Sequence, residues 1–491
     1  MLPGLREIEQ RYPDRVVVIG IHSAKFPEEQ ATEAVRQAVR RHNVRHPVAN
    51  DRHFQVWQQY ACRAWPTLMF IDPRGKVIGR HEGEFETDQL VRVVDAMLQE
   101  FEAAGWLQPG VIEFGVAGAA AQPAPEGTGP LAFPGKVAVD GRGRGHVLIA
   151  DSNHHRLVIT GLQVMDGAVH HIVGGPEPGL ADGPPDQARF NWPQGIAVDP
   201  RTGVVFIADT ENHCIRRLSP DGGRVTTIAG TGRPARMRGT GGRAQETDLS
   251  SPWDLAFLPA PDAGPPTAPG SHQDPQDDRG LLLIAMAGTH QIWALDLAAG
   301  TIGPYAGTGR EALVDGPRRE ACFAQPSALS LDSENWRLFV ADSETSAIRV
   351  IDLASGEVST LIGAGLFEFG DVDGPAQEAR LQHPLGVCYW PDDPRGSSVL
   401  IADTYNHRIK RLDLARQEVR AFAGAGPPPG YVDGPAPSAR FNEPGGLALA
   451  RGRLFVADTN NHRVRMVDLA SMAVSTLAVD ERRRAHDEKE E

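Results

Sequence analysis

Carboxylate, amide and imidazole side chains recur together at regular intervals in the larger, C-terminal part of the sequence. A ring of such groups could bind a transition metal or supply acid–base catalysis. However, Asp and Asn side chains in turns usually accept hydrogen bonds from nearby backbone, and a feature present in every repeat is better explained by the fold than by one active site. We therefore interpret the set as a structural repeat motif, and we expect no metal and no cofactor. Its members are Asp151, Asp209, Asp342, Asp403 and Asp458, with Asn212, Asn406 and Asn461, followed by His155, His213, His290, His407 and His462.

The cysteines show no spacing suited to redox or metal chemistry. They are Cys62, Cys214, Cys322 and Cys388, and no two of them form a CxxC pair. Thiol–disulfide exchange needs a thiolate and a resolving thiol, so Cys62 is only a minor catalytic candidate, and packing as a small apolar side chain is the favoured interpretation. Scattered, unpaired cysteines suit a reducing compartment, and we expect a cytoplasmic protein.

The polar motif belongs to a unit that occurs six times. The copies read "IADSNHHRL", "IADTENHCI", "IAMAGTHQI", "VADSETSAI", "IADTYNHRI" and "VADTNNHRV", and their alanines are 58, 77, 56, 61 and 55 residues apart. The one long interval contains a Pro-, Gly- and Asp-rich stretch near residues 259–280. That composition is typical of a disordered surface insertion within one repeat.

Each unit contains short β-branched runs separated by Gly, Pro and Asp turns, such as "GIAVD", "VVFIADT", "CIRRLSP" and "RVTTIAG". Four such runs predict four strands per unit. One four-stranded sheet cannot cover both of its faces, so six of them packed around an axis predict an all-β six-bladed propeller over residues 131–479. The repeated motifs resemble NHL repeats, whose fold is this propeller.

Residues 1–107 follow a different pattern. It predicts a buried strand at "VVVIGI", two helices, a hairpin turning at "DPRG" and a last amphipathic helix. This order resembles the later part of a thioredoxin-like α/β fold that lacks its first strand and its CxxC. Within that resemblance, Trp65, Pro66 and Thr67 match the cis-proline segment, which implies a substrate-binding role for them. Residues 108–130 are predicted to be a linker.

The two regions together resemble the NHL repeat-containing protein 2 family. The resemblance implies an interaction scaffold that binds a protein partner through propeller loops, and on this interpretation the chain as written is not an enzyme. The alternative is a redoxin-type thiol–disulfide oxidoreductase whose N-terminus, with the cysteine motif, lies upstream of Met1. The partner, the redox substrate, the binding face of the propeller and the oligomeric state are left open.

Net charge and hydropathy exclude some classes of partner. The net charge is −14, and residues 108–491 carry 35 Lys and Arg against 48 Asp and Glu. An acidic chain of this kind argues against a nucleic-acid partner. The longest apolar runs fall well short of the ~20 residues that span a bilayer, so we expect no membrane insertion. Residues 480–491, "DERRRAHDEKEE", are predicted to be a solvated, charged tail.

Overall fold

The computed structural model describes residues 2–83, 85, 87–107, 130–142, 145–162, 168–235, 239–260 and 280–484. The chain divides into two units, residues 1–126 and 127–491, which are described separately. The predicted linker at 108–130 and the predicted insertion at 259–280 fall almost entirely outside the described residues.

The N-terminal unit is a small α/β region that contains the predicted strand, helices and hairpin in order, together with a short strand at Val48–Asn50 that was not predicted, and its strands form two separate two-stranded sheets. β1 pairs in parallel with β2, and β3 pairs antiparallel with β4. The β3–β4 turn is the predicted one, with the Asp72 carboxylate accepting the backbone N–H groups of Arg74 and Lys76. The elements are α1 (Leu2–Arg11), β1 (Gly20–His22), α2 (Thr32–Arg41), β2 (Val48–Asn50), α3 (Gln55–Gln59), β3 (Thr67–Ile71), β4 (Val77–Glu82) and α4 (Thr87–Ala103).

One apolar cluster holds this unit together. Ile8 of α1 and Tyr12, the residue that follows this helix, pack against Leu90, Val94 and neighbouring residues of α4, with part of β3 alongside. The prediction of a buried strand at "VVVIGI" is wrong. Only Gly20 and Ile21 of that stretch belong to β1, and Val17, Ile19 and Ile21 are 43%, 55% and 42% exposed. The reason is that β1 has a strand neighbour on one edge only among the described residues.

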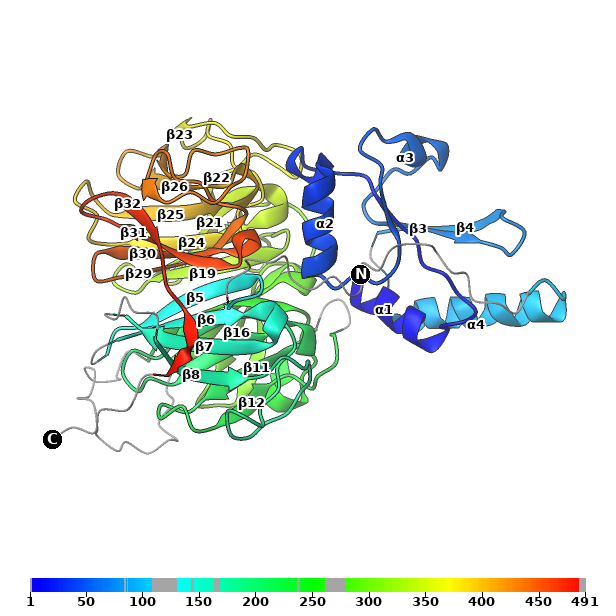
Figure 1. The fold of residues 1–491 in the computed structure, drawn as a ribbon, viewed down its shortest axis with the longest axis horizontal. Coiled ribbons are helices and arrows are strands. Elements are labelled where there is room, and N and C mark those ends of the chain that lie inside the picture. Colours follow the sequence, from blue (N-terminus) through cyan, green and yellow to red (C-terminus); the bar gives the residue numbers. More distant parts are fainter. Residues whose placement is uncertain are drawn as a thin grey trace. The chain divides into compact units, whose positions relative to one another are not determined.

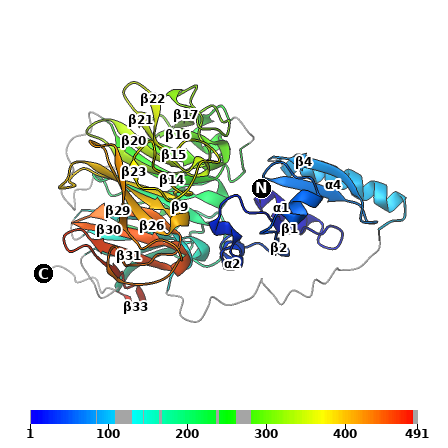
Figure 2. The ribbon, with the colours of Figure 1, turned by 90° about the horizontal axis from the view of Figure 1, so that it is seen from above.

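The second unit is a six-bladed β-propeller, as predicted, and each blade has four antiparallel strands in chain order. In Figure 2 the blades follow one another from cyan to red. Blades 1 and 2 are β5 (Pro134–Asp140), β6 (His146–Asp151), β7 (Arg156–Gly161), β8 (Ala168–Gly174) and β9 (Pro193–Val198), β10 (Val205–Asp209), β11 (Cys214–Leu218), β12 (Val225–Ala229). Blades 3 and 4 are β14 (Pro252–Pro259), β15 (Gly280–Met286), β16 (Gln291–Asp296), β17 (Thr301–Ala306) and β19 (Pro326–Asp332), β20 (Arg337–Asp342), β21 (Ala347–Asp352), β22 (Glu357–Ile362). Blades 5 and 6 are β24 (Gly386–Trp390), β25 (Ser398–Asp403), β26 (Arg408–Asp413), β27 (Glu418–Ala423) and β29 (Pro444–Ala450), β30 (Arg453–Asp458), β31 (Arg463–Asp468), β32 (Ala473–Thr476).

The apolar core lies between blades rather than within them. First strands of neighbouring blades contact one another all around the ring, so these strands are innermost. Six clusters of buried side chains each draw on two adjacent blades, and one of them joins Phe455 and Val464 of blade 6 to Val147 and Ile149 of blade 1. Each blade therefore depends on its two neighbours for burial of its faces.

Short extra strands cover most of the outer edges. The segment that precedes the first strand of blades 3 to 6 returns to pair with the outermost strand of the same blade. These strands are β13 (Gly242–Arg243), β18 (Gly316–Pro317), β23 (Gly374–Pro375) and β28 (Gly434–Pro435).

Blade 1 receives its extra strand from the other end of the chain. β33 (Asp480–Arg484) pairs in parallel with β8 (Figure 1), and the Glu481 carboxylate lies 2.6 Å from the Arg156 guanidinium. The prediction that all of 480–491 is a solvated tail is therefore wrong for its first five residues, because they add a strand to an otherwise open edge. Residues 485–491 lie outside the described part. No helix among the described residues is long and apolar enough to cross a membrane.

Candidate functional site

The motif aspartates are buried acceptors that fasten each turn. Asp209, at the end of β10, is fully buried. Its Oδ1 accepts the backbone N–H of Asn191 at 2.7 Å, and its Oδ2 accepts the Asn212 side-chain amide at 2.8 Å and the Arg216 guanidinium at 2.7 Å. Asp403 with Asn406 and Asp458 with Asn461 repeat the amide contact, and Thr345 takes the place of the asparagine beside Asp342. These contacts explain the three-residue spacing in the motif.

A buried cation, which the sequence analysis missed, stands seven residues after four of these aspartates. In blade 6 the fully buried Arg465 donates to the Asp458 carboxylate at 2.8 Å, to the Asp433 carboxylate at 2.5 Å and to the carbonyl oxygen of Val432 at 2.9 Å. A buried ion pair is favourable only when its hydrogen bonds are complete, and here the cation is held from three sides. The four cations are Arg216, Arg349, Lys410 and Arg465.

Burial also changes the acidity of these aspartates. It raises the pKa of Asp209, Asp342, Asp403 and Asp458 to about 6, against the opposite effect of the neighbouring cation. A raised carboxyl pKa can mark a catalytic acid. Here the carboxylates point into their own blade and are bonded to its backbone and side chains, so the shift follows from structural burial.

Blade 3 carries the same turn without any charge. Met286 stands at the aspartate position and Trp293 at the cation position, and both are fully buried. The Met286 sulfur accepts the backbone N–H of Ser250 at 3.4 Å, and the Trp293 indole donates to Gln291 at 3.1 Å. Because an apolar pair can replace the ion pair at this position, the motif serves the fold rather than chemistry.

The motif histidines link each blade to the next. Each has a left-handed backbone, with φ between 52° and 56°, and its Nδ1 accepts a backbone N–H from the following blade at 3.0 to 3.1 Å. In blade 4 the Ser346 hydroxyl accepts the N–H of His383 instead. His462 of blade 6 accepts from Phe133 before blade 1, so the series closes on itself. Among the described residues, no group of three potential metal ligands was found.

A hydroxyl makes a second link between most blades. The residue after the motif aspartate donates to a proline carbonyl oxygen of the next blade, as in Thr210 to Pro252 at 2.7 Å. Ser152, Ser343, Thr404 and Thr459 make the same bond. Ala287 stands at this position in blade 3 and cannot donate.

Two charged side chains meet across the propeller axis. The Lys136 ammonium on β5 lies 3.5 Å from the Asp254 carboxylate on β14, and it donates to the carbonyl oxygen of Leu385 at 2.5 Å. These contacts join blades 1, 3 and 5 of the ring. Burial lowers the pKa of Lys136 and raises that of Asp254. The sequence did not point to this pair.

The site residues predicted in the N-terminal unit lie in one aromatic turn. The Trp65–Pro66 bond is cis, and Thr67 begins β3. Trp65 is 43% exposed, packs against Trp57 with ring centroids 4.4 Å apart and the rings tilted by 31°, and donates its indole N–H to the carbonyl oxygen of Ser23 at 2.7 Å.

The cysteines give this turn no redox partner. Cys62 is a half-buried free thiol whose pKa is raised by burial. The other three cysteines are also free, and all three lie buried in the propeller. The structure thus brings Cys62 into the unit that holds Trp65, Pro66 and Thr67 but places no second thiol there among the described residues.

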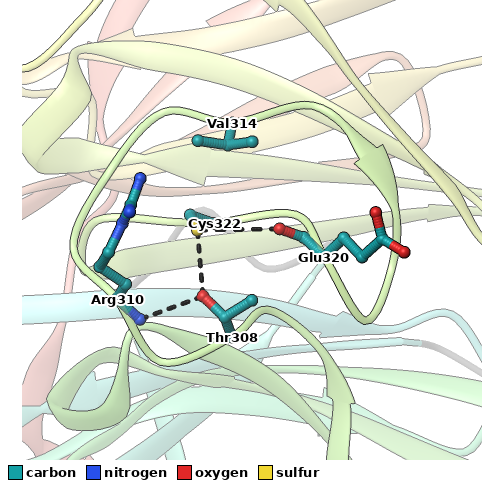
Figure 3. Close-up of a pocket in the computed structure, with 5 residues that line it drawn as sticks. All are labelled: Thr308, Arg310, Val314, Glu320 and Cys322. Carbon is teal, nitrogen blue, oxygen red and sulfur yellow. Dashed lines mark hydrogen bonds between the residues drawn. The ribbon is translucent and has the colours of Figure 1, made fainter.

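A surface pocket lies at the loop between blades 3 and 4 (Figure 3). It has a volume of about 330 Å³ and is lined by Thr308, Arg310, Val314, Glu320 and Cys322. Nothing in the sequence analysis pointed to it, although the loop can be aligned with its counterparts in the other repeats.

Comparison with known proteins gives the same assignment as the repeats. The NHL repeat family model matches residues 190–218 and 441–465. NHL repeat-containing protein 2 of Gallus gallus is 38% identical over 98% of this chain, and the Homo sapiens protein of that name is 37% identical over the same share. The chain belongs to the NHL repeat-containing protein 2 family. It spans 66% of the length of each of these two relatives.

More distant similarity extends to other proteins. Protein SUPPRESSOR OF QUENCHING 1, chloroplastic, of Arabidopsis thaliana is 36% identical over 96% of this chain, which covers 43% of that protein. The two stretches that match the repeat model contain the motif aspartate, its asparagine and its arginine in blade 2 (Asp209, Asn212, Arg216) and in blade 6 (Asp458, Asn461, Arg465). The repeat signature therefore coincides with the turn that fastens each blade.

Proposed function

We propose that this chain is an interaction scaffold whose propeller binds a protein partner through its interblade loops. The observation that carries the proposal is the position of exposed apolar side chains. Among the described propeller residues, five of the six large apolar side chains that are exposed lie on loops joining one blade to the next. We call them the loop patch: Leu180, Phe367, Val372, Tyr431 and Val432, each at least 45% exposed.

The polar groups of the repeats support the same proposal, because they are bonded within the fold and are not available as an active site. The carboxylates, cations and imidazoles of the repeats are bonded within and between blades, as Asp209, Arg216 and His213 illustrate. Rigid blades with variable loops are a common basis for recognition. Phe367 and Val372 share one interblade loop, and Tyr431 and Val432 share the next one along the ring. Exposed apolar side chains that lie together are typical of an interaction surface. The negative charge of residues 108–491 favours a basic partner.

The experiment is capture of binding proteins by the immobilised chain, compared with a triple variant, Leu180→Ser, Phe367→Ser and Tyr431→Ser. The control is Trp336→Ser, because Trp336 is 40% exposed but lies on the β19–β20 turn, away from the loop patch. Proteins retained by the wild type and the control but lost by the triple variant would support the proposal. Equal retention by all three chains would contradict it.

A thiol–disulfide oxidoreductase is the second candidate, and the open sheets of the N-terminal unit favour it. The described residues leave one edge of β1 and one edge of β3 without a strand neighbour. We propose that this unit is thioredoxin-like and that one further strand would join the two sheets. The chain itself offers only Cys62, whose raised pKa disfavours the reactive thiolate.

Reduction of insulin disulfides with dithiothreitol as electron source tests the second candidate. On the scaffold proposal, the wild type and Cys62→Ser give the same rate as buffer. A rate above buffer that disappears in Cys62→Ser would favour the oxidoreductase.

A further inference from the structure

The pocket between blades 3 and 4 exists because one repeat departs from the others. Three interblade loops share the pattern Asp-Gly-Pro followed by Ala-Arg, in "DGPPDQAR", "DGPAQEAR" and "DGPAPSAR". Their arginines are Arg189, Arg380 and Arg440. The loop before blade 4 reads "DGPRREAC" and places Cys322 at the arginine position.

In the three sister loops the arginine fills its own loop. Arg380 Nη1 donates to the carbonyl oxygens of Gln377, Glu378 and Ala379 at 3.2, 3.0 and 2.9 Å. Arg189 and Arg440 likewise donate only to backbone carbonyl oxygens among the described contacts. The arginine stem covers a glycine of the loop, since a Cβ added at Gly430 would lie 3.0 Å from Arg440 Cδ. These loops are therefore built around a guanidinium and its alkyl chain.

Cys322 leaves that space empty. Its thiol reaches only to the Thr308 hydroxyl at 3.0 Å and to the carbonyl oxygen of Glu320 at 3.9 Å (Figure 3). Glu320 occupies the position of Glu378, whose carbonyl oxygen accepts a guanidinium in blade 5. The pocket of about 330 Å³ is lined by Cys322 and Glu320, at the positions that correspond to Arg380 and Glu378 in the sister loop of blade 5.

We propose that this pocket, the Cys322 slot, binds an arginine side chain presented by a partner protein. The inference rests on the proposed scaffold function and names the chemistry that one of its loops recognises. Three copies of the same loop accept a guanidinium from their own chain, and the acidic propeller attracts a basic partner. Because a flat guanidinium presents several N–H groups in fixed directions, it matches a set of carbonyl oxygens better than the ammonium of lysine does.

One residue at the rim opposes the ligand and sharpens the test. Arg310 is exposed, lines the pocket, and carries the same charge as the proposed ligand. Its removal should strengthen binding of an arginine side chain, whereas it should weaken binding of an anion at the same place.

The experiment uses N-acetyl-arginine amide as the probe, with saturation-transfer NMR on the full chain. Binding is expected for the wild type and for Cys322→Ser, stronger binding for Arg310→Ala, and no specific binding for Cys322→Arg. The last variant restores the residue found in three sister loops, so it should fold, and its circular dichroism and unfolding midpoint will show whether it does. N-acetyl-citrulline amide, which has the same shape without the charge, should bind more weakly than the arginine probe.

A second readout reports on the slot itself. The arginine probe should slow alkylation of Cys322 by iodoacetamide, measured peptide by peptide, while leaving the rate at Cys62 unchanged. Equal probe binding by the wild type and Cys322→Arg, or no protection of Cys322, would overturn the inference. The scaffold proposal would survive that result if the loop-patch variant still lost its captured proteins. Conversely, if the arginine probe binds but the loop-patch variant captures the same proteins as the wild type, the loop patch is not the binding surface, and the proposal for the Cys322 slot still stands.

Discussion

The propeller and the N-terminal unit contain equally apolar strands but bury them to different degrees. β6, β10 and β20 lie in blades whose two faces are both covered, and their central residues are fully buried. β1 has a partner on one edge only, and Ile19 and Ile21 beside and within it are about half exposed. The comparison shows that a sequence rich in valine and isoleucine identifies a strand, whereas burial depends on what packs against it.

The largest expected difference between the two units is in resistance to proteolysis and to hydrogen exchange. We expect residues 1–107 to be cleaved and to exchange their amide protons much faster than the propeller, because local opening costs least where few apolar contacts form. Limited trypsin digestion with mass spectrometry, together with hydrogen exchange, checks this. Equal protection in both units would show that the N-terminal unit is as stable to local opening as the propeller.

Within the propeller, loss of one buried cation should have the largest mutational effect. Arg465→Met leaves the Asp458 carboxylate buried without its cationic partner and should lower the free energy of unfolding by about 3–5 kcal/mol. The double variant Asp458→Met with Arg465→Trp copies blade 3 and should recover part of that loss. Denaturant unfolding measures both.

Arg420→Met is the matched control for this series, because Arg420 pairs with Glu418 on the surface and should contribute at most about 1 kcal/mol. A loss in Arg465→Met no larger than in this control would show that the buried pair is not needed.

A fall in pH should weaken the link that His213 makes between blades 2 and 3. Burial lowers the pKa of His213 from 6.5 to about 4, so the unfolded chain binds more protons than the folded chain between these values. The contribution of neutral His213 is therefore complete above pH 6.5 and is lost as the pH falls towards 4, by up to about 3 kcal/mol.

The buried aspartates oppose this effect, because their pKa of about 6 lies above the ordinary 3.8 and favours the folded state as the pH falls through 6. The comparison of wild type with His213→Asn at each pH isolates the histidine. The advantage of the wild type should shrink from pH 7 to pH 4.5, and a constant difference would contradict the assignment.

The smallest predicted effect concerns the hydroxyl links. Thr210→Val keeps the shape of the side chain and removes one hydrogen bond to the carbonyl oxygen of Pro252, which should cost about 1 kcal/mol. Ala287→Ser adds a hydroxyl in blade 3, where the link is naturally absent, and should raise the free energy of unfolding by less than that amount. Thermal unfolding of the two variants compares them, and a stabilised Thr210→Val would count against a role for the bond.

Local patterns predicted the elements of this protein well, and partners distant in sequence account for what they missed. Six blades of four strands follow from a repeat whose period and turn residues are visible in the chain. The role of His213 could not be predicted, because its partner, the N–H of Ser251, belongs to the next blade. The Lys136–Asp254 pair is likewise formed by residues two blades apart.

Other features are visible in the sequence but were not used to predict the structure. A cation follows the motif aspartate at a constant seven residues in four repeats, and the alignment of loops isolates Cys322 as the exception. β33 was mistaken for a tail because its composition is charged, whereas its backbone is what pairs with β8.

The return of β33 to blade 1 has a mechanical consequence. At every other junction the polypeptide runs from the last strand of one blade into the first strand of the next, but blade 6 is joined to blade 1 by side-chain packing, by the Phe133–His462 and Pro134–Thr459 hydrogen bonds, and by the pairing of β33 with β8. A pulling force applied at the C-terminus would load β33 before any complete blade. Detachment of that strand would then expose the one junction that can separate without breaking the chain, so under tension the propeller should open there first.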